Sequence, residues 1–185
     1  AHNNKARALK AAALRKTGNV DAAEQVGREI LGHDPLDHWA NYELLQTWKV
    51  SKTFQVSDAQ ASLKNVLRGD VQNYLDLAFD YANAGLYAEA TEVLKMGKSP
   101  YPIVYYALGY FTAQMGDAGL AQEYYQQGAQ QNPDYCFPLR LDEQIVLEAA
   151  LGANPSDGRA AYYLGNLYYD KRQYKKAIAV WHTAT

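Results

Sequence analysis

Apolar side chains return every three or four positions through most of the chain, in stretches separated by turns rich in glycine, asparagine and proline. Trp39, Tyr42, Leu45 and Trp48, for example, recur at three-residue intervals, which places them along one side of a helix. This spacing is typical of amphipathic α-helices rather than strands. It predicts about eleven helices, no strands and therefore an all-α fold.

A second, longer period is superimposed on the helical one. A turn residue is followed five positions later by alanine at four places, and at three of these a proline follows twelve positions further on. The members are Gly18, Ala23, Pro35; Gly85, Ala90, Pro102; Gly116, Ala121, Pro133; and Arg172, Ala177. A repeat of about 34 residues indicates units of two antiparallel helices, each burying its apolar face against its neighbours.

The repeat predicts a single solenoid domain over residues 1–185. We expect units at about 2–35, 36–69, 70–101, 102–133 and 157–185, with an extra, unpaired helix at 138–151. The second half of the second unit is irregular, because Lys52 replaces the turn glycine, and its helix should begin near Ser57 or Asp58. The last unit has no proline before Thr185, so we interpret the chain as a fragment of a longer protein.

The last unit carries the most specific motif. Tyr162-Tyr-Leu-Gly-Asn-Leu-Tyr-Tyr169, followed by Tyr174, Ala177, Trp181 and Ala184, resembles a tetratricopeptide repeat. Similar positions recur around Ala78 and Gly109, and only 51–68 and 138–151 depart from the pattern. The resemblance implies an α-α superhelix whose first helices line a concave, peptide-binding groove. Its groove positions here are Tyr42, Phe79, Tyr106, Tyr110, Tyr162, Asn166 and Tyr169.

The small and bulky residues of the repeat have a structural reading. Ala78, Gly109 and Gly165 are expected where two helix backbones approach closely, and bulky residues such as Tyr125 and Trp181 fill the space around them. An alternative to a tyrosine-lined groove is that the 16 tyrosines reflect packing between neighbours. In that case the helix at 138–151 covers Tyr106 and Tyr110.

Composition and charge narrow the function classes. With 48% hydrophobic and 21% charged residues, the chain is typical of soluble globular proteins. A net charge of −2 and a pI near 6.1 argue against nucleic acid as a partner. No apolar run approaches the roughly 18 to 20 residues that span a bilayer, so no membrane insertion is expected. Cys136 is the only cysteine, which excludes an internal disulfide and leaves the compartment open.

Few residues in the sequence suggest metal binding or catalysis. His33, Asp34, Asp37 and His38 have side chains that can ligate a metal, but the same residues serve equally as an interhelical turn and a helix cap. The sequence has no glycine-rich phosphate loop and no recognisable nucleophile elbow. We therefore expect no metal, no cofactor and no catalysis, but a scaffold that binds a peptide or another domain of its parent protein.

Two further hypotheses stay open. Asp34-Pro-Leu-Asp-His38 and the stretch Tyr162–Asn166 after Asn154-Pro155 resemble the helical tail of certain large bacterial proteins with an uncharacterised, carbohydrate-related β-rich domain. That resemblance implies an accessory module of a carbohydrate-active enzyme whose catalytic domain is outside this chain. The other hypothesis is architectural: apolar side chains near Ile178 and Trp181 stack on another copy or on further repeats.

Overall fold

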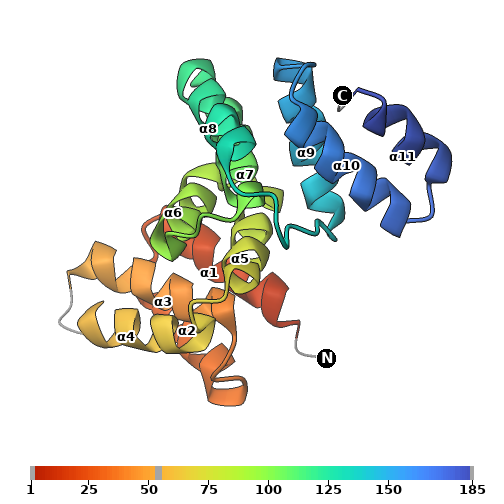
Figure 1. Cartoon of the computed structure of the whole chain (residues 1–185). Helices are drawn as coiled ribbons and strands as arrows, with labels where there is room; N and C mark the ends of the chain where they lie inside the picture. The colour runs from red at the N-terminus through yellow and green to blue at the C-terminus, as the bar shows by residue number, and fades with distance from the viewer. Residues whose placement is uncertain (1–2, 53–55, 184–185) are drawn as a thin grey trace. The chain divides into compact units, whose positions relative to one another are not determined.

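The computed structural model describes residues 3–52 and 56–183, and all regular secondary structure in these ranges is α-helical (Figure 1). This confirms the predicted all-α class. The eleven helices are α1 (Asn4–Lys16), α2 (Val20–His33), α3 (His38–Ser51), α4 (Val56–Leu67), α5 (Val71–Asn83), α6 (Tyr87–Gly97), α7 (Pro102–Gln114), α8 (Ala118–Gln130), α9 (Leu141–Ala153), α10 (Gly158–Asp170) and α11 (Tyr174–Trp181). His2 and Ala184, which the repeat included, lie outside the described residues.

The chain forms two compact units, Ala1–Leu77 and Ala78–Thr185, and α5 contributes residues to both. Each unit is built from neighbouring helices packed side by side, and each is described below by itself. The single array over 1–185 stays a prediction.

In the first unit, α3 is the central element and packs on α1, α2 and α4. Every residue from Trp39 to Trp48 is buried. The carboxylate of Asp37 caps α3 by accepting a hydrogen bond from the Ala40 amide at 2.8 Å. Gly18 makes the turn between α1 and α2 with φ of 86°, a left-handed conformation that favours glycine.

The irregular segment of the second repeat has a local explanation. α3 ends at Ser51, and its C-cap Lys52 adopts the left-handed conformation (φ 54°) that glycine adopts at the turns of the first, third and fourth predicted units. α4 begins at Val56, one residue before the earlier of the two predicted starts. The helix therefore forms in spite of the missing turn glycine.

In the second unit, two helix pairs carry the close contacts that the repeat predicted. A Cβ atom added at Gly109 of α7 would collide with the Tyr125 ring of α8, and one added at Gly165 of α10 would collide with the Trp181 indole of α11. Glycine at these two positions therefore allows the aromatic ring of the partner helix to lie directly on the backbone. The small-residue expectation is confirmed at both places.

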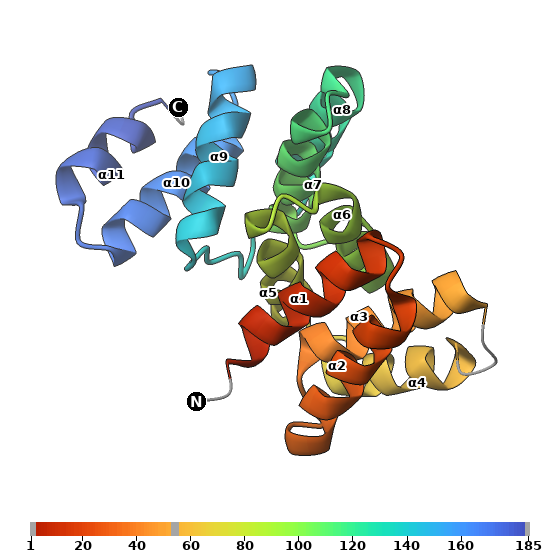
Figure 2. The same cartoon turned by 180° about the vertical axis from the view of Figure 1, so that it is seen from behind.

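The helix after the fourth unit is not unpaired, and this corrects one expectation. α9 packs on both α7 and α10, and the two views agree in placing it between them (Figures 1 and 2). Its start is fixed by Glu143, whose carboxylate accepts hydrogen bonds from the Leu139 amide (2.6 Å) and the Arg140 amide (2.9 Å) and pairs with the Arg140 guanidinium (2.9 Å). α9 thus joins the core of the second unit.

No helix within the described ranges has both the length and the apolar character needed to cross a membrane.

Candidate functional site

One face of α10 combines exposure with recognition chemistry. Tyr162, Asn166 and Tyr169 are spaced four and three residues apart, so they share one side of the helix. Tyr162 is 43% exposed, Tyr169 is 58% exposed, and Asn166 is partly exposed. The opposite side of α10 is buried through Tyr163, Leu164 and Leu167. We call Tyr162, Asn166 and Tyr169 the α10 face.

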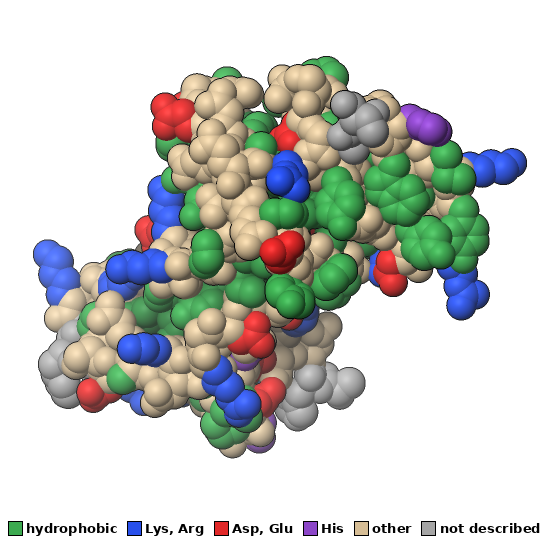
Figure 3. Space-filling model, viewed as in Figure 1, with side chains coloured by type: hydrophobic (Ala, Val, Ile, Leu, Met, Phe, Trp, Pro, Cys, Tyr) green, Lys and Arg blue, Asp and Glu red, His purple; other side chains and the backbone are tan. Residues whose placement is uncertain are grey.

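α11 contacts the Tyr169 ring and the Tyr162 backbone of the α10 face. The Tyr169 ring lies 5.2 Å from the Tyr174 ring and 5.9 Å from the Trp181 ring, measured between centroids. The Trp181 indole nitrogen donates a hydrogen bond to the Tyr162 carbonyl at 3.3 Å. Figure 3 shows hydrophobic side chains gathered over α10 and α11. The face is therefore aromatic, and α11 restrains the Tyr169 ring.

The other predicted groove residues are placed differently. Tyr42, Phe79 and Tyr106 are 1%, 5% and 0% exposed, which corrects the expectation that they line an open groove. Tyr42 lies within the buried run of α3, and the Phe79 ring packs edge-on against Phe111 at 5.9 Å. Tyr110 is half-buried, with its ring 6.3 Å from the Tyr87 ring. These four side chains serve mainly to pack the helices.

Tyr106 shows why a groove position can become core. Its hydroxyl donates to the Asp157 carboxylate, with distances of 3.1 and 3.0 Å to the two oxygens, and its ring lies edge-on to Tyr163 at 6.2 Å. Burial, followed by the negative charge of Asp157, raises the pKa of the Tyr106 hydroxyl well above its ordinary value of 10. Tyr106 therefore packs between neighbouring helices, as the alternative to a tyrosine-lined groove expects. The residues that bury it include Asp157 and Tyr163 at the start of α10.

Tyr110 lies beside a cavity that α9 also lines. Tyr110, Tyr87 and Phe111 line a small cavity together with Ile145 and Val146 of α9. The packing alternative drawn from the sequence is that the helix at 138–151 covers both Tyr106 and Tyr110. In the structure α9 lines one cavity together with Tyr110, whereas Asp157 and Tyr163 contact Tyr106.

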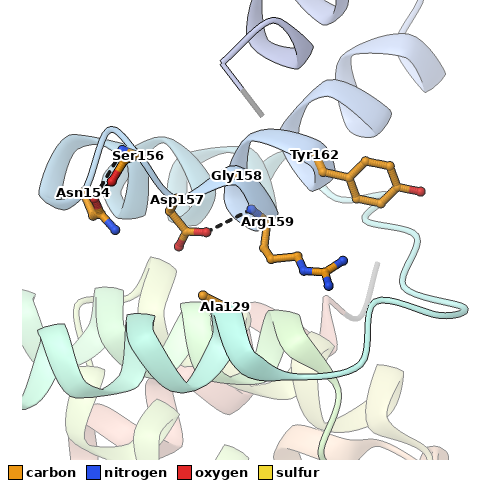
Figure 4. A pocket seen from close by; sticks show the side chains of 7 residues that line it. All are labelled: Ala129, Asn154, Ser156, Asp157, Gly158, Arg159 and Tyr162. Carbon is orange, nitrogen blue, oxygen red and sulfur yellow. Dashed lines mark hydrogen bonds between the residues drawn. The ribbon is translucent and has the colours of Figure 1, made fainter. Parts of the chain in front are cut away.

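Two cavities adjoin at the N-terminal end of the α10 face. The first, about 460 Å³, is lined by Ala129, Asn154, 156–159 and Tyr162, and Figure 4 shows the Arg159 side chain extending into the space between α10 and α8. The second, about 540 Å³, is lined by 133–137 of the loop before α9, again with Arg159 and Tyr162. Arg159 and Tyr162 therefore form a common wall.

Arg159 and the loop were missed from the sequence. Arg159 stands three residues before Tyr162, so the same helical spacing that selected the α10 face could have found it. The loop carried no signal, because exposed and buried apolar residues look alike in a sequence.

The groups around these cavities suit binding better than covalent chemistry. Asp157 is occupied, since its carboxylate accepts hydrogen bonds from the Tyr106 hydroxyl and from the amides of Arg159 (3.1 Å) and Ala160 (3.0 Å). Burial raises the pKa of the Cys136 thiol to about 11, so at neutral pH it is protonated and a poor nucleophile. The accessible groups include the Arg159 guanidinium, the Asp134 carboxylate and the Tyr135, Phe137 and Tyr162 rings.

The suspected metal residues of the first unit act as turn and cap. Asp37 caps α3, and Asp34 accepts a hydrogen bond from the Leu36 amide at 3.2 Å. Among the residues that the structure describes, no group of three or more His, Cys, Asp or Glu side chains could hold a metal ion.

Comparison with known proteins identifies helical-repeat structures at low similarity. No family model matches the chain, and no curated protein matches its sequence. Among solved structures, MamA is 17% identical with a TM-score of 0.37, over 94% of this chain and 91% of MamA. TTC0263, a thermophilic TPR protein of Thermus thermophilus, is 18% identical with a TM-score of 0.34, over 98% and 89%. YrrB, described as a TPR protein with an unusual peptide-binding site, is 16% identical with a TM-score of 0.34, over 85% and 90%. The fold assignment rests on the helix pairs of this chain itself.

Proposed function

We propose that the chain is a noncatalytic scaffold that binds a peptide or a partner domain through the α10 face. The observation that carries the proposal is the pair of exposed tyrosines, Tyr162 and Tyr169, on a helix whose reverse side is buried. Exposed aromatic rings gathered on one face are typical of interaction sites, because leaving them in water gives up the free energy of burying them.

The geometry favours recognition at low entropic cost. Tyrosine offers a large, rigid contact surface with only two side-chain torsions, and contacts with Tyr174 and Trp181 restrict Tyr169 further. Asn166, between the two tyrosines, carries one acceptor and two donors that can pair with a peptide backbone. A ligand laid along α10 would therefore meet apolar, polar and apolar groups in turn.

The test is a screen of immobilised 15-residue peptides, followed by calorimetry on the best binder. Tyr162→Ala combined with Tyr169→Ala should weaken binding at least about 10-fold, because aromatic anchors dominate interface energetics. Tyr124→Ala is the matched control, since Tyr124 is a half-buried tyrosine of α8 outside this face. Equal affinity of the wild type and the double variant would rule out the α10 face.

A glycan array run with the same proteins addresses the carbohydrate alternative. Oligosaccharide binding that depends on Tyr162 and Tyr169, without any peptide binding, would replace the scaffold proposal by the accessory-module hypothesis.

A further inference from the structure

The loop between α8 and α9 displays apolar side chains at alternate positions. Tyr135, Phe137 and Leu139 are 89%, 65% and 51% exposed, whereas Cys136 and Pro138 between them are buried. Tyr135 lies in a turn and has a left-handed backbone (φ 59°). From Cys136 to Leu139 buried and exposed side chains alternate, as they do along an extended segment. Three apolar side chains are thus presented together on the outside of the second unit.

The backbone of this loop is fixed from within. The Phe137 amide donates to the Tyr101 hydroxyl at 3.2 Å, the Cys136 amide donates to the Pro133 carbonyl at 3.2 Å, and the Leu139 amide donates to Glu143. Pro138 has no amide hydrogen to offer. A partner therefore cannot add to the loop as a β-strand through these amides, and recognition has to use the side chains.

The second cavity joins the loop to α10. Tyr135 and Phe137 line it on one side, and Arg159 and Tyr162 line it on the other. Tyr162 belongs to the α10 face, so the exposed apolar surface of the loop continues into the proposed binding surface. The volume of about 540 Å³ lies within the range of cavities that hold ligand groups, about 300 to 1,000 Å³.

The guanidinium of Arg159, in the wall that the two cavities share, indicates the charge of a ligand. Two acidic side chains line these cavities with Arg159: Asp157 lines only the first, and Asp134 lines only the second. The Asp157 carboxylate already accepts hydrogen bonds from the Tyr106 hydroxyl and from backbone amides. No ion pair to the Arg159 guanidinium is present among the described residues. A carboxylate bound in the first cavity would meet Arg159 away from Asp134, and arginine pairs with carboxylates through two parallel hydrogen bonds.

We propose that the loop 133–137 and Arg159 extend the α10 face into a site for a peptide that carries a carboxylate next to a bulky apolar side chain. The carboxylate pairs with Arg159 in the first cavity, and the apolar side chain packs against Phe137 and Tyr162 in the second. This inference rests on the proposed function and names the chemistry of its ligand. An anionic lipid surface fits less well, because the loop itself contains Asp134 and Asp142 follows it at the start of α9.

The test uses two small probes, N-acetyl-Leu-Phe with a free carboxylate and the same dipeptide with a carboxamide end, titrated into the ¹⁵N-labelled protein and followed by NMR. The acid should shift the amides of Arg159, Tyr162 and 133–137 and should bind about 10-fold more tightly than the amide, the size expected for a charge-assisted hydrogen bond. Equal affinity of the two probes, or shifts confined to other residues, would overturn the proposal.

Three variants separate the contributions. Arg159→Gln should abolish the preference for the acid, and Phe137→Ser should weaken both probes. Leu141→Ser is the control, because Leu141 is 65% exposed but lines neither cavity; it should bind like the wild type. Arg159, Phe137 and Leu141 are all exposed, so we expect the three variants to fold. Circular dichroism checks this by comparing their helicity with that of the wild type.

The same variants distinguish this inference from the proposed function. If peptides selected in the screen lose affinity with Tyr169→Ala but not with Arg159→Gln or Phe137→Ser, the α10 face is a binding site and the extension is wrong. If neither set of substitutions changes peptide affinity, both are wrong.

Discussion

The pairs α7–α8 and α10–α11 are built alike, yet their outer faces differ. Each pair has a glycine whose backbone is covered by an aromatic ring sixteen residues later, Gly109 by Tyr125 and Gly165 by Trp181. Each also has a tyrosine three residues before that glycine. Tyr106 is fully buried, whereas Tyr162 is 43% exposed. Equivalent positions in a repeat therefore share a local contact without sharing an environment.

The difference arises from the segments that pack against each pair. After α8, the loop 131–140, helix α9 and the start of α10 fold back over α7, so that Asp157 and Tyr163 close over Tyr106. The corresponding side of α10 keeps its tyrosines exposed within the second unit. The segment after α8 thus turns one predicted groove position into core, whereas the equivalent tyrosine of α10 stays exposed.

The largest expected effect comes from truncating the two equivalent tyrosines. Tyr106→Ala should cost about 3 to 5 kcal/mol of unfolding free energy, because it removes a buried ring and leaves the Asp157 carboxylate with one donor fewer. Tyr162→Ala should cost less, about 1 kcal/mol, since this residue is already 43% exposed. Urea unfolding followed by circular dichroism measures both. Similar losses for the two variants would show that the burial contrast is wrong.

A smaller effect is expected where the two pairs are alike. Gly109→Ala and Gly165→Ala should each destabilise by about 1 to 3 kcal/mol, because the added methyl group forces Tyr125 or Trp181 away from the backbone. Gly152→Ala in α9 is the control, since nothing lies within 4 Å of the added atom. There, alanine should be neutral or stabilising by up to about 1 kcal/mol. Destabilisation of the Gly152→Ala variant would show that alanine destabilises these helices without any clash with a partner helix, which would contradict the explanation by ring contact.

A pH dependence of stability is also expected from the buried tyrosines. Burial, with a hydrogen bond to Glu148, raises the pKa of Tyr168 to about 12, and burial raises the pKa of Tyr125 to about 12. Because the folded pKa lies above the ordinary value of 10, the stabilisation is complete below pH 10. It declines as pH rises through 12, by at most about 1.4 kcal/mol per pH unit for each proton.

Urea unfolding at pH 8, 10, 11 and 12 measures this decline. Tyr168→Phe should reduce the slope between pH 10 and 12, because phenylalanine has no proton to lose. A slope in the Tyr168→Phe variant equal to that of the wild type would contradict the assignment of the dependence to the Tyr168 hydroxyl.

Much of the local structure could be predicted from the sequence. Helical spacing predicted the helices, and the spacing between Tyr162 and Tyr169 predicted their common face. The glycine and aromatic positions predicted where α7 meets α8 and where α10 meets α11. These features depend on neighbouring residues of the same helix or hairpin, whose geometry is set by backbone hydrogen bonding and close packing.

Only the tertiary structure decided which of these faces remain open. Tyr106 is buried through Asp157, a residue 51 positions away, and α9 proved to be packed between two helices rather than unpaired. Phe137 and Arg159 met at one cavity although no spacing in the sequence links them. Periodicity tells which side of a helix is apolar, but burial depends on which distant segment covers that side. That cover makes Tyr106 part of the core and leaves Tyr162 exposed.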